Sequence, residues 1–167
     1  MTEPLADRPF IPAYGEVPES TDGMVTWAWA RERLERAITY WLATSGADGS
    51  PHIVAIWGVW VGGCCFVEGK PGATRWQRNL GENPKAAIKI ESDDEVIIVE
   101  GFVVEHVAPP SPLANAILAG FAKYRAKGYE ASAERWAEGG LWELRPVKAF
   151  AWSVYPEDMA RFRFSAT

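Results

Sequence analysis

The sequence predicts a mainly β, α+β domain in which a mostly antiparallel sheet closes into a small barrel with helices attached to it. Runs rich in Ile, Val and Trp alternate with short turn signals such as residues 47–50 and 62–63, as is typical of strands joined in hairpins. Links this short join antiparallel neighbours, because parallel neighbours need long crossover connections. Stretches with helical spacing stand mainly before and after the strands, which indicates appended helices. Closure into a barrel is the economical architecture, because it removes exposed edges.

The chain is predicted to form one domain preceded by an arm. Residues 1–23 place Pro and Gly among polar residues without any period, which predicts an N-terminal arm that is either disordered or laid over a partner subunit. Residues 24–167 are predicted as a single domain. It carries a helical insertion at about residues 112–138, where helical spacing follows a Pro-rich link.

The domain is predicted to begin with a helix and a short strand. Thr26 is suited to cap a helix, and apolar residues follow it at helical spacing until about residue 39. A strand over residues 40–45 comes next. Trp27 and Trp41 are assigned to the core by this pattern.

Two strands and a helix are predicted after the first turn. Residues 52–61, a run rich in Ile, Val and Trp, are predicted to form one strand. The pair Gly62-Gly63 is predicted to form a tight turn that joins it to a second strand over residues 64–68. A short helix over residues 74–83 is ended by Pro84.

The remaining strands close the predicted sheet. Residues 85–91 and 95–105 are predicted as a strand pair, with Gly101 marking a bulge or a close backbone approach. After the helical insertion, residues 141–154 are predicted as one or two closing strands interrupted at Pro146.

Composition excludes several classes of protein. The chain has 167 residues, a net charge of −5 and 48% hydrophobic residues, values typical of a folded globular protein. An acidic balance argues against a general nucleic-acid binder, because binding phosphates needs excess Lys and Arg. No apolar run approaches the roughly 20 residues that span a bilayer, and the first 20 residues lack the pattern of a signal peptide. A cytoplasmic protein that binds no membrane is therefore predicted.

The cysteines and the aromatic residues leave the kind of site open. Cys64 and Cys65 are adjacent, so a disulfide between them would distort the backbone. Two such thiols are too few for a structural zinc site, and we predict reduced cysteines and no metal site. The nine Trp residues either fill the core or line a pocket for a flat ligand. Trp57 and Trp60 should face opposite sides of a regular strand, so that one packs inward and the other faces a neighbour or a ligand.

Charge is sorted along the chain in a way that points to an anion site. Residues 70–89 contain five basic residues and one acid, and residues 91–105 contain six acids and no base. Arg75 and Arg78 follow the candidate cap Thr74, although positive side chains are disfavoured at a helix N-terminus. A bound phosphate group would resolve this conflict. The alternative is that both Arg side chains are solvated or pair with the acidic run.

Common catalytic motifs are absent from the sequence. It contains no Gly-x-Ser-x-Gly, no His-Glu-x-x-His, no Cys-x-x-Cys, no Walker loop and no Gly-x-Gly-x-x-Gly. His52 has no identifiable acid–base partner. An enzyme of this kind would therefore borrow its reactive group from a cofactor.

Motifs in a fixed order give the chain a resemblance to a known family. These are residues 40–52, Val59-Trp60 ahead of Gly62-Gly63, Arg75 with Arg78-Asn79-Leu80 and Asn83-Pro84, Glu95-Val96 with Val99-Glu100-Gly101, and residues 121–124, 150–152 and 160–164. Together they resemble the pyridoxamine 5'-phosphate oxidase-like split β-barrel proteins, which include FMN-binding members and F420-dependent reductases. The resemblance covers roughly residues 27–164.

The resemblance implies a split β-barrel of FMN-binding-like architecture and an activity. It implies a homodimer with two cofactor sites at the subunit interface, FMN as the cofactor with F420 as the alternative, and hydride transfer to or from a small organic substrate. The implied cofactor-binding residues lie along the ring, around the phosphate and at the pocket rim: His52, Ile53, Val54, Ala55 and Trp57; Lys70, Thr74, Arg75, Trp76, Arg78 and Asn79; Lys123 and Tyr124.

Three residues depart from the family's pattern. Trp76 stands where many members have Lys, Glu68 where a small hydroxyl residue is usual, and Ala55 where Pro is frequent. Trp76 removes a phosphate partner, and Glu68 would repel an anion. An alternative hypothesis is therefore a non-catalytic module that binds or sequesters a flat ligand or cofactor.

Overall fold

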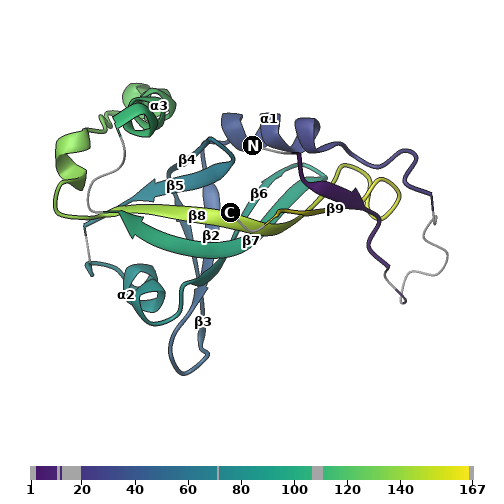
Figure 1. The fold of residues 1–167 in the computed structure, drawn as a ribbon, viewed down its shortest axis with the longest axis horizontal. Coiled ribbons are helices and arrows are strands. Elements are labelled where there is room, and N and C mark those ends of the chain that lie inside the picture. The colour runs from purple at the N-terminus through teal and green to yellow at the C-terminus, as the bar shows by residue number, and fades with distance from the viewer. Residues whose placement is uncertain (1–2, 11, 13–19, 71, 107–110, 166–167) are drawn as a thin grey trace.

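The computed structural model describes residues 3–10, 12, 20–70, 72–106 and 111–165 (Figure 1). In chain order the elements are β1 (Leu5–Asp7), α1 (Trp27–Arg36), β2 (Tyr40–Ser45), β3 (Pro51–Ile56), β4 (Gly58–Val61), β5 (Cys64–Glu68), α2 (Arg75–Glu82), β6 (Lys85–Ser92), β7 (Glu95–His106), α3 (Ser111–Phe121), the 3₁₀ helices η2 (Ala122–Lys127) and η3 (Ala133–Trp136), β8 (Leu141–Trp152) and β9 (Ala160–Arg163).

The strands form one antiparallel sheet that branches at β8. The main path runs β1-β9-β8-β7-β6-β2-β3, and β5 pairs with both β4 and β8. The first four residues of β8 pair with β5, and residues nearer its end pair with β9. A single long strand therefore joins the two parts of the barrel. The predicted mainly β, mostly antiparallel α+β class is confirmed.

Trp57 interrupts the strand predicted over residues 52–61. β3 ends at Ile56 and pairs with β2, whereas β4 begins at Gly58 and pairs with β5. The prediction of one continuous strand is wrong, because the backbone of Gly58 is bonded elsewhere: its N–H donates to the Tyr124 hydroxyl over 3.0 Å. A Cβ at Gly58 would also lie 3.0 Å from the carbonyl oxygen of Phe66.

A bulge lets the two longest strands bend together. The register of β7 against β8 shifts between Glu100 and Gly101, and Gly101 stands opposite Pro146. The bulge predicted at Gly101 is confirmed. The predicted interruption at Pro146 is wrong, since β8 passes through this residue. Proline lacks the N–H that a regular ladder needs, and the bulge provides a place for it.

Part of the predicted arm is folded onto its own chain. Leu5–Asp7 pair with β9, a strand that the sequence did not reveal. Asp7 accepts two hydrogen bonds from Arg161, of 2.7 and 2.8 Å. Arg8 donates to the carbonyl oxygens of Ser20, Asp22 and Glu157. Residues 1–2, 11 and 13–19 of the predicted arm lie outside the described residues.

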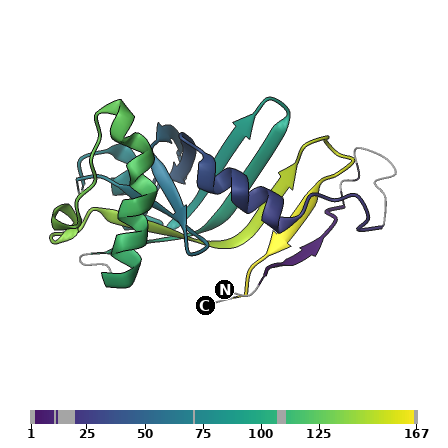
Figure 2. The same cartoon turned by 90° about the horizontal axis from the view of Figure 1, so that it is seen from above.

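Two hydrophobic clusters hold the helices to the sheet. Figure 2 shows α1 lying across the sheet and α3 standing at one end. The first cluster contains Trp27, Leu34 and Trp60, and the second, beneath α3, contains Ile117 and Phe121. Trp27 is 9% exposed, which confirms its core assignment.

The core assignment of Trp41 is wrong. Trp41 is 39% exposed, because alternate residues of β2 face outward and Tyr40 and Leu42 take the inward positions.

The described residues between β7 and β8 include one α-helix and two 3₁₀ helices. α3 ends at Phe121 and passes into the 3₁₀ helix η2, which Gly128 ends with φ 78°. Across the residues that are described, no helix has the length and apolar character needed to cross a membrane.

Candidate functional site

Two adjoining cavities lie between β3, the N-terminal end of α2 and the helical insertion. The smaller cavity has a volume of about 330 Å³ and is lined by Ala55, Trp57 and Thr74 among others. The larger cavity has about 670 Å³ and includes Lys70 and Arg135 in its lining. Both are lined by Glu68, Gly69 and Tyr129. Volumes of this size suit small-molecule ligands.

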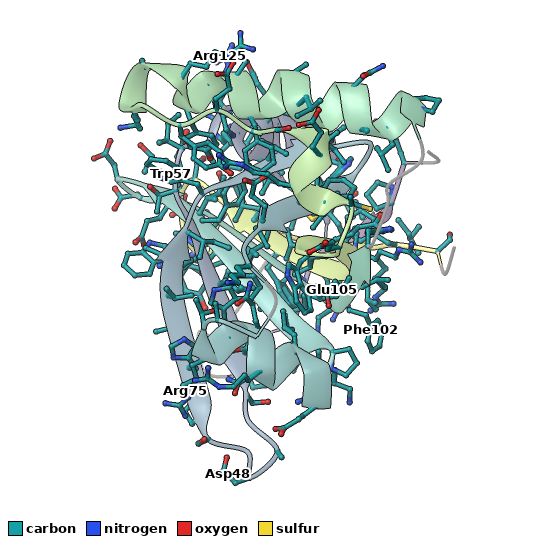
Figure 3. The ribbon with its side chains drawn as sticks, turned by 90° about the vertical axis from the view of Figure 1, so that its left-hand side faces the viewer. Asp48, Trp57, Arg75, Phe102, Glu105 and Arg125 are labelled. Atoms are coloured by element: carbon teal, nitrogen blue, oxygen red, sulfur yellow. The ribbon has the colours of Figure 1, made fainter. Side chains whose placement is uncertain are left out.

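Stacked aromatic rings form one wall of the smaller cavity. The Trp57 ring is stacked on Tyr124, with ring centroids 4.9 Å apart and planes 14° apart. Tyr129 meets Trp57 edge-on at 5.5 Å. Figure 3 shows Trp57 below the helical insertion and well above Arg75. Trp57 faces the cavity, whereas Trp60 is only 4% exposed. One Trp therefore packs inward and the other faces the cavity, as the sequence predicts.

Tyr124 holds the backbone at Gly58, the corner between β3 and β4 beside which the Trp57 ring forms the aromatic wall. It is fully buried, and its hydroxyl lies 2.6 Å from the Gly58 carbonyl and 2.9 Å from the Ile38 carbonyl while it accepts the Gly58 N–H. Burial raises the pKa of Tyr124 to about 12, so the hydroxyl keeps its proton at neutral pH. Tyr124 therefore lies behind Trp57 and holds the backbone corner that presents this ring.

We expect Tyr124→Phe to lower the free energy of unfolding by roughly 1–3 kcal/mol, because it leaves the buried Gly58 N–H without an acceptor. Urea unfolding followed by Trp fluorescence measures this change. Tyr129→Phe, at a half-buried ring that meets Trp57 edge-on, is the matched comparison. An equal loss in both variants would contradict the role assigned to Tyr124.

The predicted ring-facing residues on β3 divide between two faces. Ile53 and Ala55 are exposed, whereas His52 and Val54 are half-buried on the opposite face. Of these four, only Ala55 lines the smaller cavity. The cavity lining also includes Ile56, the next residue of the same strand.

The predicted phosphate-binding Arg residues are both exposed near the N-terminal end of α2. Arg75 donates to the Ser50 hydroxyl over 3.0 Å, and Figure 3 shows it beside the hairpin tip that carries Asp48. Hydrogen bonds from Ser50, with Arg75 nearby, lower the pKa of Asp48. Arg78 donates to the Gly72 carbonyl over 3.3 Å. A ligand anion could exchange with these solvent-exposed neutral partners at little cost.

Trp76 and Asn79 are buried beneath the exposed Arg residues. Trp76 is 5% exposed and meets Trp142 edge-on, with centroids 5.6 Å apart, and it also lines the smaller cavity. Asn79 is 6% exposed and donates to the Thr44 hydroxyl over 3.0 Å. The structure thus uses Asn79 to fasten α2 to β2.

Gln77 is a polar residue of this region that sequence reasoning missed. Its Oε1 accepts the Thr74 N–H over 2.9 Å, which fixes the orientation of the amide. Its Nε2 is buried and has no hydrogen-bond partner among the described residues. A Cβ placed on Gly69 would lie 2.6 Å from this Nε2. The capping-box position, three residues after the cap, is the sequence signal that would have found Gln77.

The two predicted Lys residues have different surroundings. Lys70 is exposed and lines the larger cavity. Lys123 lines neither cavity and donates to the Ala37 carbonyl at the C-terminal end of α1 over 2.6 Å. Burial lowers the pKa of Lys123 to about 8. A cation at a helix C-terminus is favourable, which gives Lys123 a structural reason for its position.

Glu68 is held by the helical insertion. Its Oε2 accepts the Trp136 Nε1–H over 2.9 Å, and its Oε1 lies 3.8 Å from Arg135 Nη1. Burial raises the pKa of this carboxyl group. The expected repulsion of an anion by Glu68 is therefore reduced, since Arg135 partly balances the charge and burial favours the neutral form.

Solved structures with the same fold were found, although no family model and no curated protein matches the sequence. A conserved hypothetical protein from Mycobacterium tuberculosis matches with a TM-score of 0.62 at 18% identity, over 77% of this chain and 85% of that one. An F420 reductase matches with a TM-score of 0.55 at 26% identity, over 71% and 94%. The heme storage protein HutZ from Vibrio cholerae matches with a TM-score of 0.54 at 17% identity, over 72% and 89%.

These neighbours agree with the branched antiparallel sheet and with the helices that cover it. The order of motifs pointed to the same architecture. The chain therefore has the split β-barrel fold shared by the pyridoxamine 5'-phosphate oxidase-like proteins.

Proposed function

We propose that the protein is an oxidoreductase of the pyridoxamine 5'-phosphate oxidase-like kind that binds FMN, or alternatively F420, in the smaller cavity and acts on a small organic substrate. One observation carries the proposal. A cavity with an aromatic wall at Trp57 reaches Thr74 at the N-terminal end of α2. Arg75 and Arg78 lie exposed on this helix, outside the lining of the cavity. The cavity thus offers a flat surface for a ring next to positive charge and free amides for a phosphate.

The residues around the cavity fit such a group. Gly69 lets the Gln77 amide approach the backbone closely, because a Cβ at Gly69 would lie 2.6 Å from Gln77 Nε2. This buried Nε2 has no hydrogen-bond partner among the described residues. Arg75, Arg78 and Lys70 would hold the phosphate, and Thr74 begins the helix whose amides face it. Trp76 does not prevent this role, because its ring is turned into the core against Trp142.

The chain's own residues would bind, orient and dehydrate the reactants. Ala55 and Trp57 would lie along the flat ring, and the Trp57–Tyr124 stack would keep this surface rigid. A bound flavin or deazaflavin supplies the hydride chemistry. Phe121 and Tyr129 of the insertion would exclude water from the reacting atoms.

The comparisons support a flat cofactor without choosing one. The F420 reductase is similar over most of its length, while HutZ is a heme storage protein. None of the described residues that line the two cavities is His, Cys or Met, the usual axial ligands of heme iron. The exposed Arg pair suits a phosphate. These two observations favour a phosphorylated cofactor over heme.

Turnover separates the oxidoreductase from the alternative of a non-catalytic module. We expect the protein to oxidise its reduced cofactor when a quinone, nitro compound or enone is supplied, measured by the change in cofactor absorbance. Cofactor binding without turnover of any of these acceptors would favour the binding or sequestering module.

We propose that the protein forms a homodimer through the outer face of its sheet, with the cofactor sites at the interface. Trp41, Ile98 and Phe150 stand on that face in one cross-strand row, with Lys89 between Trp41 and Ile98. Trp41 and Ile53 are exposed at 39% and 61%. Exposed apolar side chains gathered on one face are typical of an interaction surface. A second copy would cover it and complete the cavity beside β3.

We expect Ile98→Glu to convert a dimer into a monomer, because the interface would have to bury the new carboxylate beside Phe150. Light scattering coupled to gel filtration measures the mass. Val154→Glu, at a 53% exposed position in the turn after β8, should leave the dimer intact. A wild-type protein that is monomeric at high concentration would overturn the proposed dimer.

A further inference from the structure

We infer that Glu68 is the proton donor of the reaction and that the larger cavity holds the substrate, an uncharged unsaturated acceptor such as an enone or a quinone. The inference rests on the proposed function, in which the smaller cavity holds the cofactor ring. Glu68 lies at the last position of β5, opposite Leu141 of β8. Its side chain lines both cavities and therefore stands where a ring in one would meet a substrate in the other.

The two oxygens of the Glu68 carboxyl group have different surroundings. Oε2 is fixed by the indole N–H of Trp136, a residue only 1% exposed. Oε1 lies 3.8 Å from Arg135 Nη1, which is beyond hydrogen-bonding distance. The side chain is 13% exposed. One oxygen is thus held in place while the other is left to carry and donate a proton.

Glu68 differs from the other ionisable groups around the cavities. It is the only carboxylic acid among the described residues that line the smaller cavity. Glu138, Lys70 and Arg135 line the larger cavity with it, and all three are exposed. Burial raises the pKa of Glu68 although Trp136 and Arg135 oppose the shift. The protonated form therefore persists to a higher pH than for an ordinary Glu, which suits a general acid.

The step balances with the reduced cofactor as the hydride source. A hydride, which carries the two electrons, would go from the reduced flavin or deazaflavin to one end of the substrate's conjugated system. The Glu68 O–H bond breaks, and its proton forms a new C–H or O–H bond at the other end. The substrate is reduced, the cofactor is oxidised, and the carboxylate of Glu68 takes a new proton from water in the larger cavity.

The test compares Glu68→Gln with Glu32→Gln, which changes an exposed carboxyl group on α1 that lines neither cavity. The amide of Gln keeps an acceptor for Trp136 but cannot donate a proton as an acid. We expect Glu68→Gln to bind the cofactor as the wild type does, to lose kcat on the order of 100-fold, and to lose the fall in wild-type kcat with rising pH. Glu32→Gln should match the wild type in all three measurements.

A second readout needs no turnover. In protein with ¹³C-labelled Glu side chains, NMR titration should show one carboxyl resonance with a midpoint above the usual Glu range, and Glu68→Gln should remove it. Thermal unfolding of Glu68→Gln checks that the fold is intact. Should the fold be lost, Glu68→Asp, which keeps the acid but shortens its reach, must lose kcat and still show the fall in kcat with rising pH.

The outcomes are distinguishable. Wild-type kcat and an unchanged pH profile in Glu68→Gln, with cofactor binding intact, would overturn the role of Glu68 and leave the proposed function standing. Absence of cofactor binding by the wild type would overturn the proposed function and this inference together. A carboxyl midpoint in the ordinary Glu range would also overturn the assignment of Glu68 as the acid.

Discussion

Replacing Gly101 with alanine is expected to lower the free energy of unfolding by roughly 3 kcal/mol or more. A Cβ at this position would lie 1.9 Å from the carbonyl oxygen of Arg145 and 3.1 Å from the Cα of Pro146. Both atoms belong to the backbone of β8, so no side-chain rotation relieves the clash. The bulge between β7 and β8 would have to open. Urea unfolding followed by Trp fluorescence measures the loss.

Gly81→Ala is the matched control, because no atom lies within 4 Å of a Cβ built at Gly81 on α2. Alanine is favoured over glycine within a helix, and we expect this variant to gain roughly 0.5–1 kcal/mol. A Gly101→Ala protein as stable as the wild type would mean that the close approach of the two strands is not needed.

Removing both Arg75 and Arg78 is expected to raise the Kd for the cofactor on the order of 100-fold or more. Hydrogen bonds to a charged group each contribute about 1.5–3 kcal/mol, and 1.4 kcal/mol corresponds to a factor of ten. Their present partners, the Ser50 hydroxyl and the Gly72 carbonyl, are neutral and exposed. The fold should therefore be little affected. Titration calorimetry of Arg75→Ala/Arg78→Ala with FMN and with F420 measures the change.

Arg36→Ala provides the control for loss of positive charge. Arg36 is 79% exposed on α1 and pairs with Glu32 at 2.9 Å, away from both cavities. The Kd should stay within about twofold of the wild-type value. An equal weakening by Arg36→Ala would mean that overall charge, rather than a phosphate site on α2, governs binding.

Local signals in the sequence predicted most of the strand order. The Gly62-Gly63 turn and the runs around it led to β4 and β5, and Gly101 led to the bulge. The corner at Trp57 could not be predicted in the same way. It depends on a hydrogen bond between Gly58 and Tyr124, which are 66 residues apart in the chain. β9 has only four residues and is stabilised by β1 and β8 on either side, so its own sequence carries little signal.

The candidate site was predictable in part for the same reason. Charge patterning drew attention to Arg75 and Arg78 because both lie close together in the chain. The cavity beside them is built from β3, β5, α2 and the insertion, which only the tertiary fold brings together. Lys123 and Tyr124 matched a family motif, yet both lie behind the aromatic wall of the smaller cavity. Lys123 donates to a carbonyl group at the C-terminal end of α1, and Tyr124 lies beneath the Trp57 ring. Glu68 stood out only as a departure, and its contact with Trp136 gives it a defined environment.

The central claim is that the smaller cavity holds a phosphorylated, flat redox cofactor. The most direct test is thermal unfolding of the purified wild-type protein with saturating FMN and, separately, with saturating F420. A ligand that binds only the folded state raises the midpoint, and we predict a clear rise with one of the two that Arg75→Ala/Arg78→Ala abolishes. An unchanged midpoint with both cofactors would contradict the account.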